Sequence, residues 1–273
     1  MTRKTSALLL AVMVVAGCSL STDLPPLKPI SIVTVRSIPD VASPSGFVAK
    51  AFGFFFSERG FSYSDSRLAT NTCAGPQAVN LGGTGPAQWL DPGQPTQFTL
   101  RSPGVPPRTV QLLSGLPDED AHVYTNATTP TLYPGSDSSA ITVPGAAGGF
   151  PAITVIGKTV EDFTFDPVAD SGGTGGLAVH WSPSTNSNSA MEVALVYKND
   201  PTASALNTQI VCSLLDDGDF TVPRQFLDGW QKAGEDANPL DHEVHFTRYL
   251  TVLATAGDAS ILLLNTLDKK EIK

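Results

Sequence analysis

The sequence predicts an all-β protein with an antiparallel β-sandwich architecture, either one large sandwich or two docked modules, and one short helix near residues 222–234. From Ile30 onward, short apolar or alternating runs are broken by Gly, Pro, Asn, Asp and Ser, which is typical of strands joined by turns. The 24 glycines and 22 prolines in 273 residues leave little uninterrupted chain for long helices. A hydrophobic content of 41% with 16% charged residues is sufficient for a core.

Apolar alternation and β-branched or aromatic content predict the individual strands. In chain order they are 30–35, 47–56, 97–101, 108–113, 122–126, 139–143, 152–157, 162–165, 177–181, 191–197, 208–215, 243–254 and 260–267. The last two flank the segment TAGDA, whose Gly-Asp pair predicts the clearest hairpin.

The predicted helix, VPRQFLDGWQKAG, covers residues 222–234. Pro223 suits the first helical position and Gly234 suits a C-terminal cap. Phe226, Leu227 and Trp230 share one face at helical spacing, which favours core packing over a ligand platform.

The Gly-rich stretch DPVADSGGTGG (166–176) suggests a division into an N-terminal β module, 46–168, and a C-terminal β module, 169–273. The segment LAVHWSPS that follows resembles a strand of fibronectin-type sandwiches, which implies that Trp181 is buried between sheets. A single sandwich stays open as the alternative, because a disulfide between Cys73 and Cys212 would cross this boundary.

The N-terminus has the layout of a secretory signal. Two basic residues precede the apolar run 7–15, which is too short for the about 20 residues that span a bilayer. The tetrad Val-Ala-Gly-Cys that ends at Cys18 resembles the lipobox of bacterial lipoproteins. This resemblance implies cleavage before Cys18, a signal peptide over 1–17 and lipid chains such as palmitate on Cys18.

Residues 18–45 are therefore expected to form a lipidated tether and a leading strand, with the Pro-rich stretch 21–30 extended. Ser19, in place of Asp, implies the outer membrane by the sorting rule of Gram-negative lipoproteins. A second segment, IVCSLLDDGDFTVP (210–223), resembles a pattern in uncharacterised β-sandwich lipoproteins, which implies the fold and no chemistry.

With Cys18 lipidated, Cys73 and Cys212 form an even pair in an oxidising compartment, and we expect a disulfide. Two separately buried thiols are the alternative. The net charge of −9 would become about −11 after removal of the signal, because Arg3 and Lys4 leave with it. An acidic surface disfavours nucleic acid and anionic headgroups, so the expected partners are the membrane, through the lipid on Cys18, and an envelope protein or glycan.

The sequence contains no recognisable catalytic or metal motif, and we expect no metal and no cofactor. The segment DHEVHF falls one residue short of the zincin spacing, and on a strand His242 would share a face with Val244 and Phe246 while His245 points away. The acids Asp216, Asp217 and Asp219 do not fit the calcium-loop pattern and are expected to be solvated turn residues.

Together these features predict a lipid-anchored cell-envelope lipoprotein that acts as a non-catalytic binding or scaffolding β-sandwich. The alternative is an envelope hydrolase without a recognisable motif. That alternative requires His180, His242 or His245 to converge with an acid in a deep pocket.

Overall fold

The structure, a computed structural model, describes residues 27–59, 71–78, 88–114, 123–168, 175–199, 203–235 and 242–272. These residues form an all-β, sandwich-like fold, as predicted. The elements are β1 (Leu27–Pro39), β2 (Phe47–Arg59), β3 (Thr72–Ala78), β4 (Gln88–Trp89), β5 (Thr96–Ser102), β6 (Val105–Ser114), β7 (Val123–Asn126), β8 (Ser138–Val143), β9 (Ile153–Lys158), β10 (Leu177–His180), β11 (Ala190–Tyr197), β12 (Thr208–Leu215), β13 (Asp219–Val222), the 3₁₀ helix η1 (Arg224–Phe226), α1 (Asp228–Glu235), β14 (His242–Ala256) and β15 (Ala259–Ile272).

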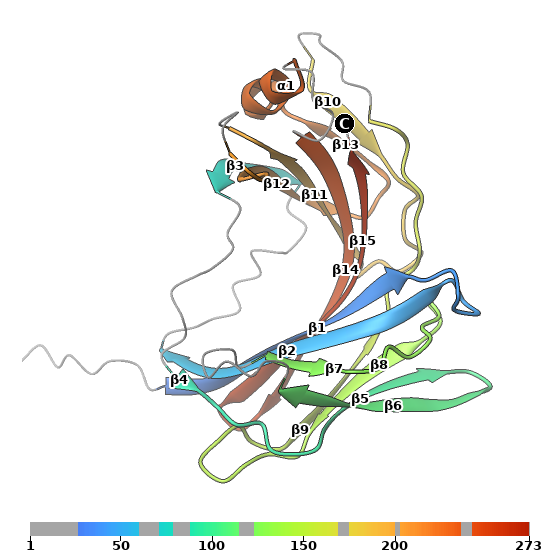
Figure 1. The fold of residues 1–273 in the computed structure, drawn as a ribbon, viewed down its shortest axis with the longest axis vertical. Coiled ribbons are helices and arrows are strands. Elements are labelled where there is room, and N and C mark those ends of the chain that lie inside the picture. The colour runs from blue at the N-terminus through green and yellow to red at the C-terminus, as the bar shows by residue number, and fades with distance from the viewer. Residues whose placement is uncertain are drawn as a thin grey trace, which may run out of the picture.

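One 13-stranded sheet contains most of these strands, in the order β3-β12-β11-β14-β15-β1-β2-β7-β6-β5-β8-β9, with β4 beside β2. The named pairs are antiparallel except β1 with β15. A separate two-stranded sheet is formed by β10 and β13. Figure 1 shows β14 and β15 running from the upper group of strands, which includes β11 and β12, into the lower group, which includes β1, β2 and β9.

The hairpin of β14 and β15 forms as the sequence predicts. Ala256 lies opposite Ala259, so Gly257 and Asp258 make a two-residue turn. Gly257 has φ +60°, a left-handed conformation that glycine adopts without steric cost. The hairpin therefore places two long strands side by side through the whole molecule.

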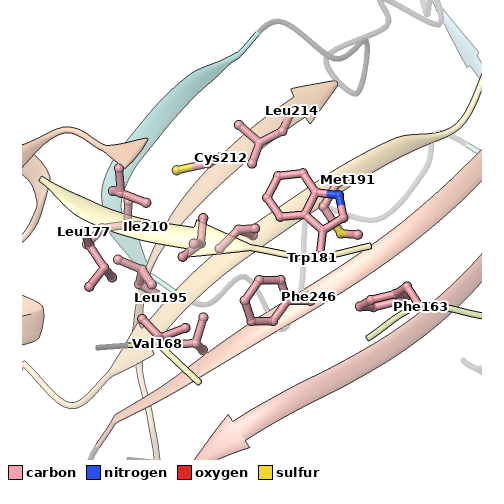
Figure 2. Close-up of a cluster of buried hydrophobic side chains, with 14 of the residues drawn as sticks. Phe163, Val168, Leu177, Trp181, Met191, Leu195, Ile210, Cys212, Leu214 and Phe246 are labelled. Atoms are coloured by element: carbon pink, nitrogen blue, oxygen red, sulfur yellow. The ribbon is translucent and has the colours of Figure 1, made fainter. Parts of the chain in front are cut away.

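Buried side chains gather in two clusters. The upper cluster lies between the β12-β11-β14 sheet and the β10-β13 pair; Figure 2 shows Trp181 and Phe246 inside it. It contains Val160, Phe163, Val168, Leu177, Val179, Trp181, Met191, Val193, Leu195, Tyr197, Ile210, Cys212, Leu214, Val222, Leu227, Trp230, Val244, Phe246, Leu250 and Leu267. The burial of Trp181 agrees with the sequence-based expectation.

The lower cluster lies inside the curled remainder of the sheet. It contains Val33, Val35, Ala49, Ala51, Phe55, Phe98, Leu100, Leu112, Leu132, Ile141, Val143, Phe150, Ile153, Val155, Ala259, Ile261 and Leu263. The two clusters do not follow the division at residues 168 and 169. Phe163 belongs to the upper cluster and Leu263 to the lower one, because the 15-residue β14 and the 14-residue β15 extend through both.

Several element predictions need correction. Residues 162–165 do not form a strand, because they make one isolated β-bridge, between Phe165 and Trp181, and no continuous ladder. The helix is divided: Leu227 donates to Arg224 O in η1, and α1 continues past Gly234, the expected cap, to Glu235. Strand β1 begins at Leu27, inside the expected tether, because its first residues pair with β2.

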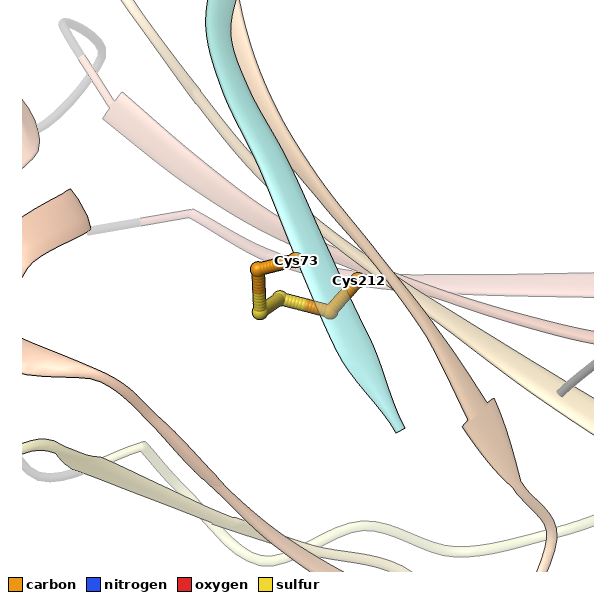
Figure 3. The surroundings of a disulfide bond; sticks show 2 residues. All are labelled: Cys73 and Cys212. Atoms are coloured by element: carbon orange, nitrogen blue, oxygen red, sulfur yellow. A yellow bond between two sulfur atoms is a disulfide. The ribbon is translucent and has the colours of Figure 1, made fainter. Parts of the chain in front are cut away.

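The expected disulfide between Cys73 and Cys212 is present. Cys73 on β3 lies directly opposite Cys212 on β12, and the bond joins residues 139 positions apart (Figure 3). It fixes β3 as the edge strand of the upper sheet. In the chain, β3 lies between β2 and β4, which both belong to the lower group of strands. The disulfide therefore attaches β3 to the upper group.

Candidate binding groove

Three adjoining cavities form a groove at the junction of the two hydrophobic clusters. The first has a volume of about 560 Å³, the second about 460 Å³ and the third about 340 Å³. The first and second share Gly135 and Lys158, and the second and third share Ser102, Pro103 and Ser136. The three cavities therefore adjoin one another around the turn 133–137.

One margin of the groove is an open strand edge. Strand β11 begins at Ala190, opposite Tyr249 of β14. Beyond that point, within the described residues, no strand is hydrogen-bonded to the side of β14 that faces away from β15. Residues Leu250 to Val252 on this edge line the first cavity.

The first wall of the groove, the loop 182–189, is attached to a buried ion pair. The guanidinium Nε of Arg248 lies 2.7 Å from Oδ2 of Asp216, and both side chains are at most 2% exposed. Trp181 Nε1 donates to Oδ1 of Asp216 at 2.8 Å, and the Ser189 hydroxyl donates to Oδ2 at 2.6 Å. The expectation that Asp216 is a solvated turn residue is wrong, because these groups replace its hydration.

Arg248 also binds backbone carbonyls of two further segments. Its Nη1 donates to the carbonyl of Asp162 at 3.1 Å, and its Nη2 donates to the carbonyl of Ser182. The guanidinium lies over the Phe163 ring, 5.0 Å from the centroid. One buried cation therefore fixes the positions of the segment 161–163 and the loop 182–189, which line or adjoin the first cavity.

The second wall, the turn 133–137, is attached to a second ion pair, which is partly buried. Arg108 Nη2 lies 2.9 Å from each carboxylate oxygen of Asp137, whose side chain is fully buried. The Ser102 hydroxyl and the Tyr133 N–H also donate to Asp137. The Arg108 guanidinium lies 5.2 Å from the Tyr133 ring centroid. Each wall is thus attached to an Arg–Asp ion pair.

Glu161 joins the loop 182–189 to the segment that follows β9. The hydroxyl of Thr185 donates to its carboxylate, as do the Thr185 N–H at 2.8 Å and the Ser184 hydroxyl at 3.1 Å. These bonds, the Thr185 hydroxyl foremost, hold the pKa of Glu161 below its ordinary value, and partial burial opposes them. The carboxylate is therefore ionised at neutral pH.

The lining of the first cavity is mainly neutral and polar. Hydroxyl and amide side chains line it from Thr159, Thr185, Asn186, Ser187, Asn188 and Thr251. Such groups both donate and accept hydrogen bonds. The arrangement suits a ligand that presents many donors and acceptors.

The three histidines considered for a hydrolase lie apart from the groove lining. His180 is exposed on β10, and the ring of His242 lies 4.9 Å from that of Trp230 on α1. His242 is buried on the face of Val244 and Phe246 while the partly exposed His245 points away, as predicted. No group of three or more His, Cys, Asp or Glu side chains that could hold a metal occurs in the described part of the chain.

His245 is bonded to Glu243 at 2.5 Å, and Glu243 also accepts from Lys270 at 2.9 Å. Burial alone would raise the pKa of Glu243, but these two bonds outweigh it and lower that pKa. The three side chains form a local hydrogen-bonded cluster on the hairpin of β14 and β15.

The expected lipidation site, Cys18, and the expected signal peptide, 1–17, lie outside the described residues. Among the residues that are described, no helix is both long and apolar enough to cross a membrane. The groove was not foreseen, because its lining comes from turns far apart in sequence and no local pattern marks them.

No protein-family model matches the chain, and no curated protein matches it. The chemistry of the groove is therefore inferred from its own residues.

Proposed function

We propose that this protein is a lipid-anchored, non-catalytic binding protein of the cell envelope and that the groove is its binding site. The observation that carries the proposal is that each wall of the groove is attached to an Arg–Asp ion pair: Arg248–Asp216, in which both side chains are buried, and Arg108–Asp137, in which the carboxylate is buried. A buried ion pair contributes little net stability, because desolvation offsets the attraction. Pairs of this kind are better explained by the fixed geometry that they give to the turns above them.

The lipid anchor rests on the sequence around Cys18. The apolar run 7–15 is too short to span a bilayer and ends in a tetrad similar to the lipobox. Several acyl chains on one cysteine give stable membrane residence, whereas one chain gives only marginal binding. Binding is supported by the lining of the first cavity, whose described residues offer mainly hydroxyl and amide groups that donate and accept hydrogen bonds.

The test of the anchor is intact-mass and peptide mass spectrometry of the protein extracted from the membranes of a bacterial host. We expect a chain that begins at Cys18 and carries acyl chains on that residue. The Cys18→Ser variant should move to the soluble fraction, whereas the control variant Ser21→Ala should stay in the membrane fraction.

A chain that begins at residue 1 and carries an unmodified Cys18 contradicts the proposal, as does membrane association that persists in Cys18→Ser. Measurable hydrolysis of esters, peptides or glycosides that is lost in His180→Ala, His242→Ala or His245→Ala would contradict the non-catalytic part. The two parts are thus tested by separate readouts.

A further inference from the structure

A row of three side chains crosses the outer face of the sheet at the second cavity. Arg101 of β5 lies opposite Ser138 of β8, and Ser138 lies opposite Lys158 of β9. All three line the second cavity, and both cationic side chains are exposed. Directly opposite residues have Cβ atoms about 5 Å apart, so Arg101 and Lys158 lie about 10 Å apart on either side of Ser138. Both side chains are long enough to reach a single anion above the serine.

These two cations have no carboxylate partner in the described part of the chain. The other wall of their cavity contains Asp137, but that carboxylate is already bound to Arg108. Most other cations of the described chain are paired: ion pairs to carboxylates are formed by Arg36, Arg108, Arg224, Arg248, Lys269 and Lys270. In a chain of net charge −9, an unpaired Arg101 and Lys158 produce a local positive potential that attracts an anion.

The adjoining first cavity has a different character. Its described lining is rich in neutral hydroxyl and amide groups, and the carboxylate of Glu161 in that lining is bound by Thr185 and Ser184. A ligand that occupies both cavities therefore has an anionic group at one end and many hydroxyl-type donors and acceptors along the rest. Acyl chains would need apolar walls, and a free inorganic anion would leave the larger cavity unused.

We propose that the groove binds an acidic polysaccharide, with a sugar carboxylate held by Arg101 and Lys158 and the neighbouring sugar hydroxyls held by the first cavity. This inference rests on the proposed function in taking the groove as the binding site. Arg101 supplies a planar guanidinium that can bind a carboxylate through two parallel hydrogen bonds. Ser138, between the cations, can donate a further hydrogen bond.

The test is isothermal titration of the full chain, extracted in detergent, with tetragalacturonate as the probe and the neutral galactotetraose as its matched control. We expect tetragalacturonate to bind and galactotetraose to bind at least about tenfold more weakly. Arg101→Gln and Lys158→Gln should each weaken tetragalacturonate binding about tenfold, as expected for losing a charge-assisted contact. Lys232→Gln, which removes an exposed lysine on α1, should leave it unchanged.

A second pair of variants tests the hydroxyl-binding part of the groove. Asn188→Ala, in the first cavity, should weaken tetragalacturonate binding about fivefold, whereas Asn199→Ala, an exposed asparagine outside the groove, should have no effect. Because these side chains are exposed, thermal unfolding of all five groove and control variants should match that of the unmodified chain.

Three results would overturn the inference. If galactotetraose bound as tightly as tetragalacturonate, and Arg101→Gln weakened neither, the two cations would have no role in binding. Binding of polyglutamate or inorganic phosphate as tight as that of tetragalacturonate would leave an anion site without glycan recognition. Absence of tetragalacturonate binding at millimolar concentration would refute the ligand class, and acylation of Cys18 would still be decided separately by mass spectrometry.

Discussion

Asp216 and Arg248 show how single residues set the geometry of the groove. Both are almost fully buried, and together they bind the side chains of Trp181 and Ser189 and the carbonyl of Ser182. Removal of one partner leaves an uncompensated charge in the interior, which costs more than the pair itself contributes. The pair is therefore best tested by removing one side of it.

We predict that Asp216→Ala lowers the free energy of unfolding by about 3 to 5 kcal/mol, because it leaves the Arg248 guanidinium buried without its counter-ion. The neighbouring exposed acid supplies the control: Asp217→Ala should change stability by less than about 0.5 kcal/mol. Chemical denaturation at neutral pH measures both values. If Asp216→Ala and Asp217→Ala both changed the free energy of unfolding by equally small amounts, the ion pair would not hold this part of the structure together.

Glu161 predicts a dependence of stability on pH. Its pKa is lower in the folded protein than its ordinary value of 4.5, chiefly because of the Thr185 hydroxyl, so the folded state binds fewer protons than the unfolded state. Its stabilising contribution is therefore present above about pH 5 and is lost as the pH falls through the folded-state pKa. Glu161→Gln should be less stable than the unmodified protein at pH 7, and the difference should shrink below about pH 5. A difference that stays constant from pH 7 to pH 3 would contradict this assignment.

Some residue-level features could be predicted from the sequence and others could not. The opposite faces of His242 and His245 follow from strand alternation, and the burial of Trp181 is implied by the resemblance to fibronectin-type sandwiches. The cysteine pairing follows from the even count that remains when Cys18 is set aside. Asp216 was misread, because neighbouring acids and Gly218 resemble a solvated turn. Its partner, Arg248, is brought beside it only by the tertiary fold, which no local pattern encodes.

At the scale of elements, the sequence predicts strands where apolar and polar residues alternate regularly. It misses a strand that is held in place by tertiary contacts instead of by its own alternation. Strand β3, with the sequence TCAGPQA, contains Gly75 and Pro76 and has no apolar alternation. Pairing with β12 and the disulfide hold it in place. Conversely, residues 162–165 alternate like a strand, but their backbone forms a single bridge, between Phe165 and Trp181, and the carbonyl of Phe163 accepts from the side chain of Lys269.

The disulfide should be the main attachment of β3. Non-reducing peptide mapping should recover Cys73 linked to Cys212. Replacing both cysteines by serine should lower the free energy of unfolding by about 4 to 5 kcal/mol in the chain-entropy model, because the bond closes a loop of 139 residues. Hydrogen exchange at 72–78 should rise more than at β9, which is remote from the bond. Two free thiols in freshly isolated protein would refute the crosslink.

At the scale of the whole molecule, β14 and β15 join the two hydrophobic clusters into one body. Phe246 of β14 is buried in the upper cluster and Leu263 of β15 in the lower one. The sequence suggested two successive modules, because a Gly-rich stretch separates the halves of the chain, but a hairpin long enough to serve both cores cannot be recognised before its pairing is known.

We therefore predict one cooperative unfolding transition. Phe246→Ala and Leu263→Ala should each lower the midpoint of that same transition, with losses of about 2 to 5 kcal/mol for truncating a fully buried side chain. Calorimetry together with near-ultraviolet circular dichroism measures the transition. Two separable transitions, with each variant shifting only one of them, would mean that the clusters fold independently.

The most direct test of the groove as the binding site is photo-crosslinking in intact cells that produce the full chain. A photoreactive residue at position 187, on the exposed loop that lines the first cavity, is compared with one at position 258, in the exposed hairpin turn outside the groove. The predicted result is a higher-mass adduct with envelope material from position 187 and none from position 258. Equal adducts from both positions, or none from position 187, would contradict the assignment of the groove as the site of binding.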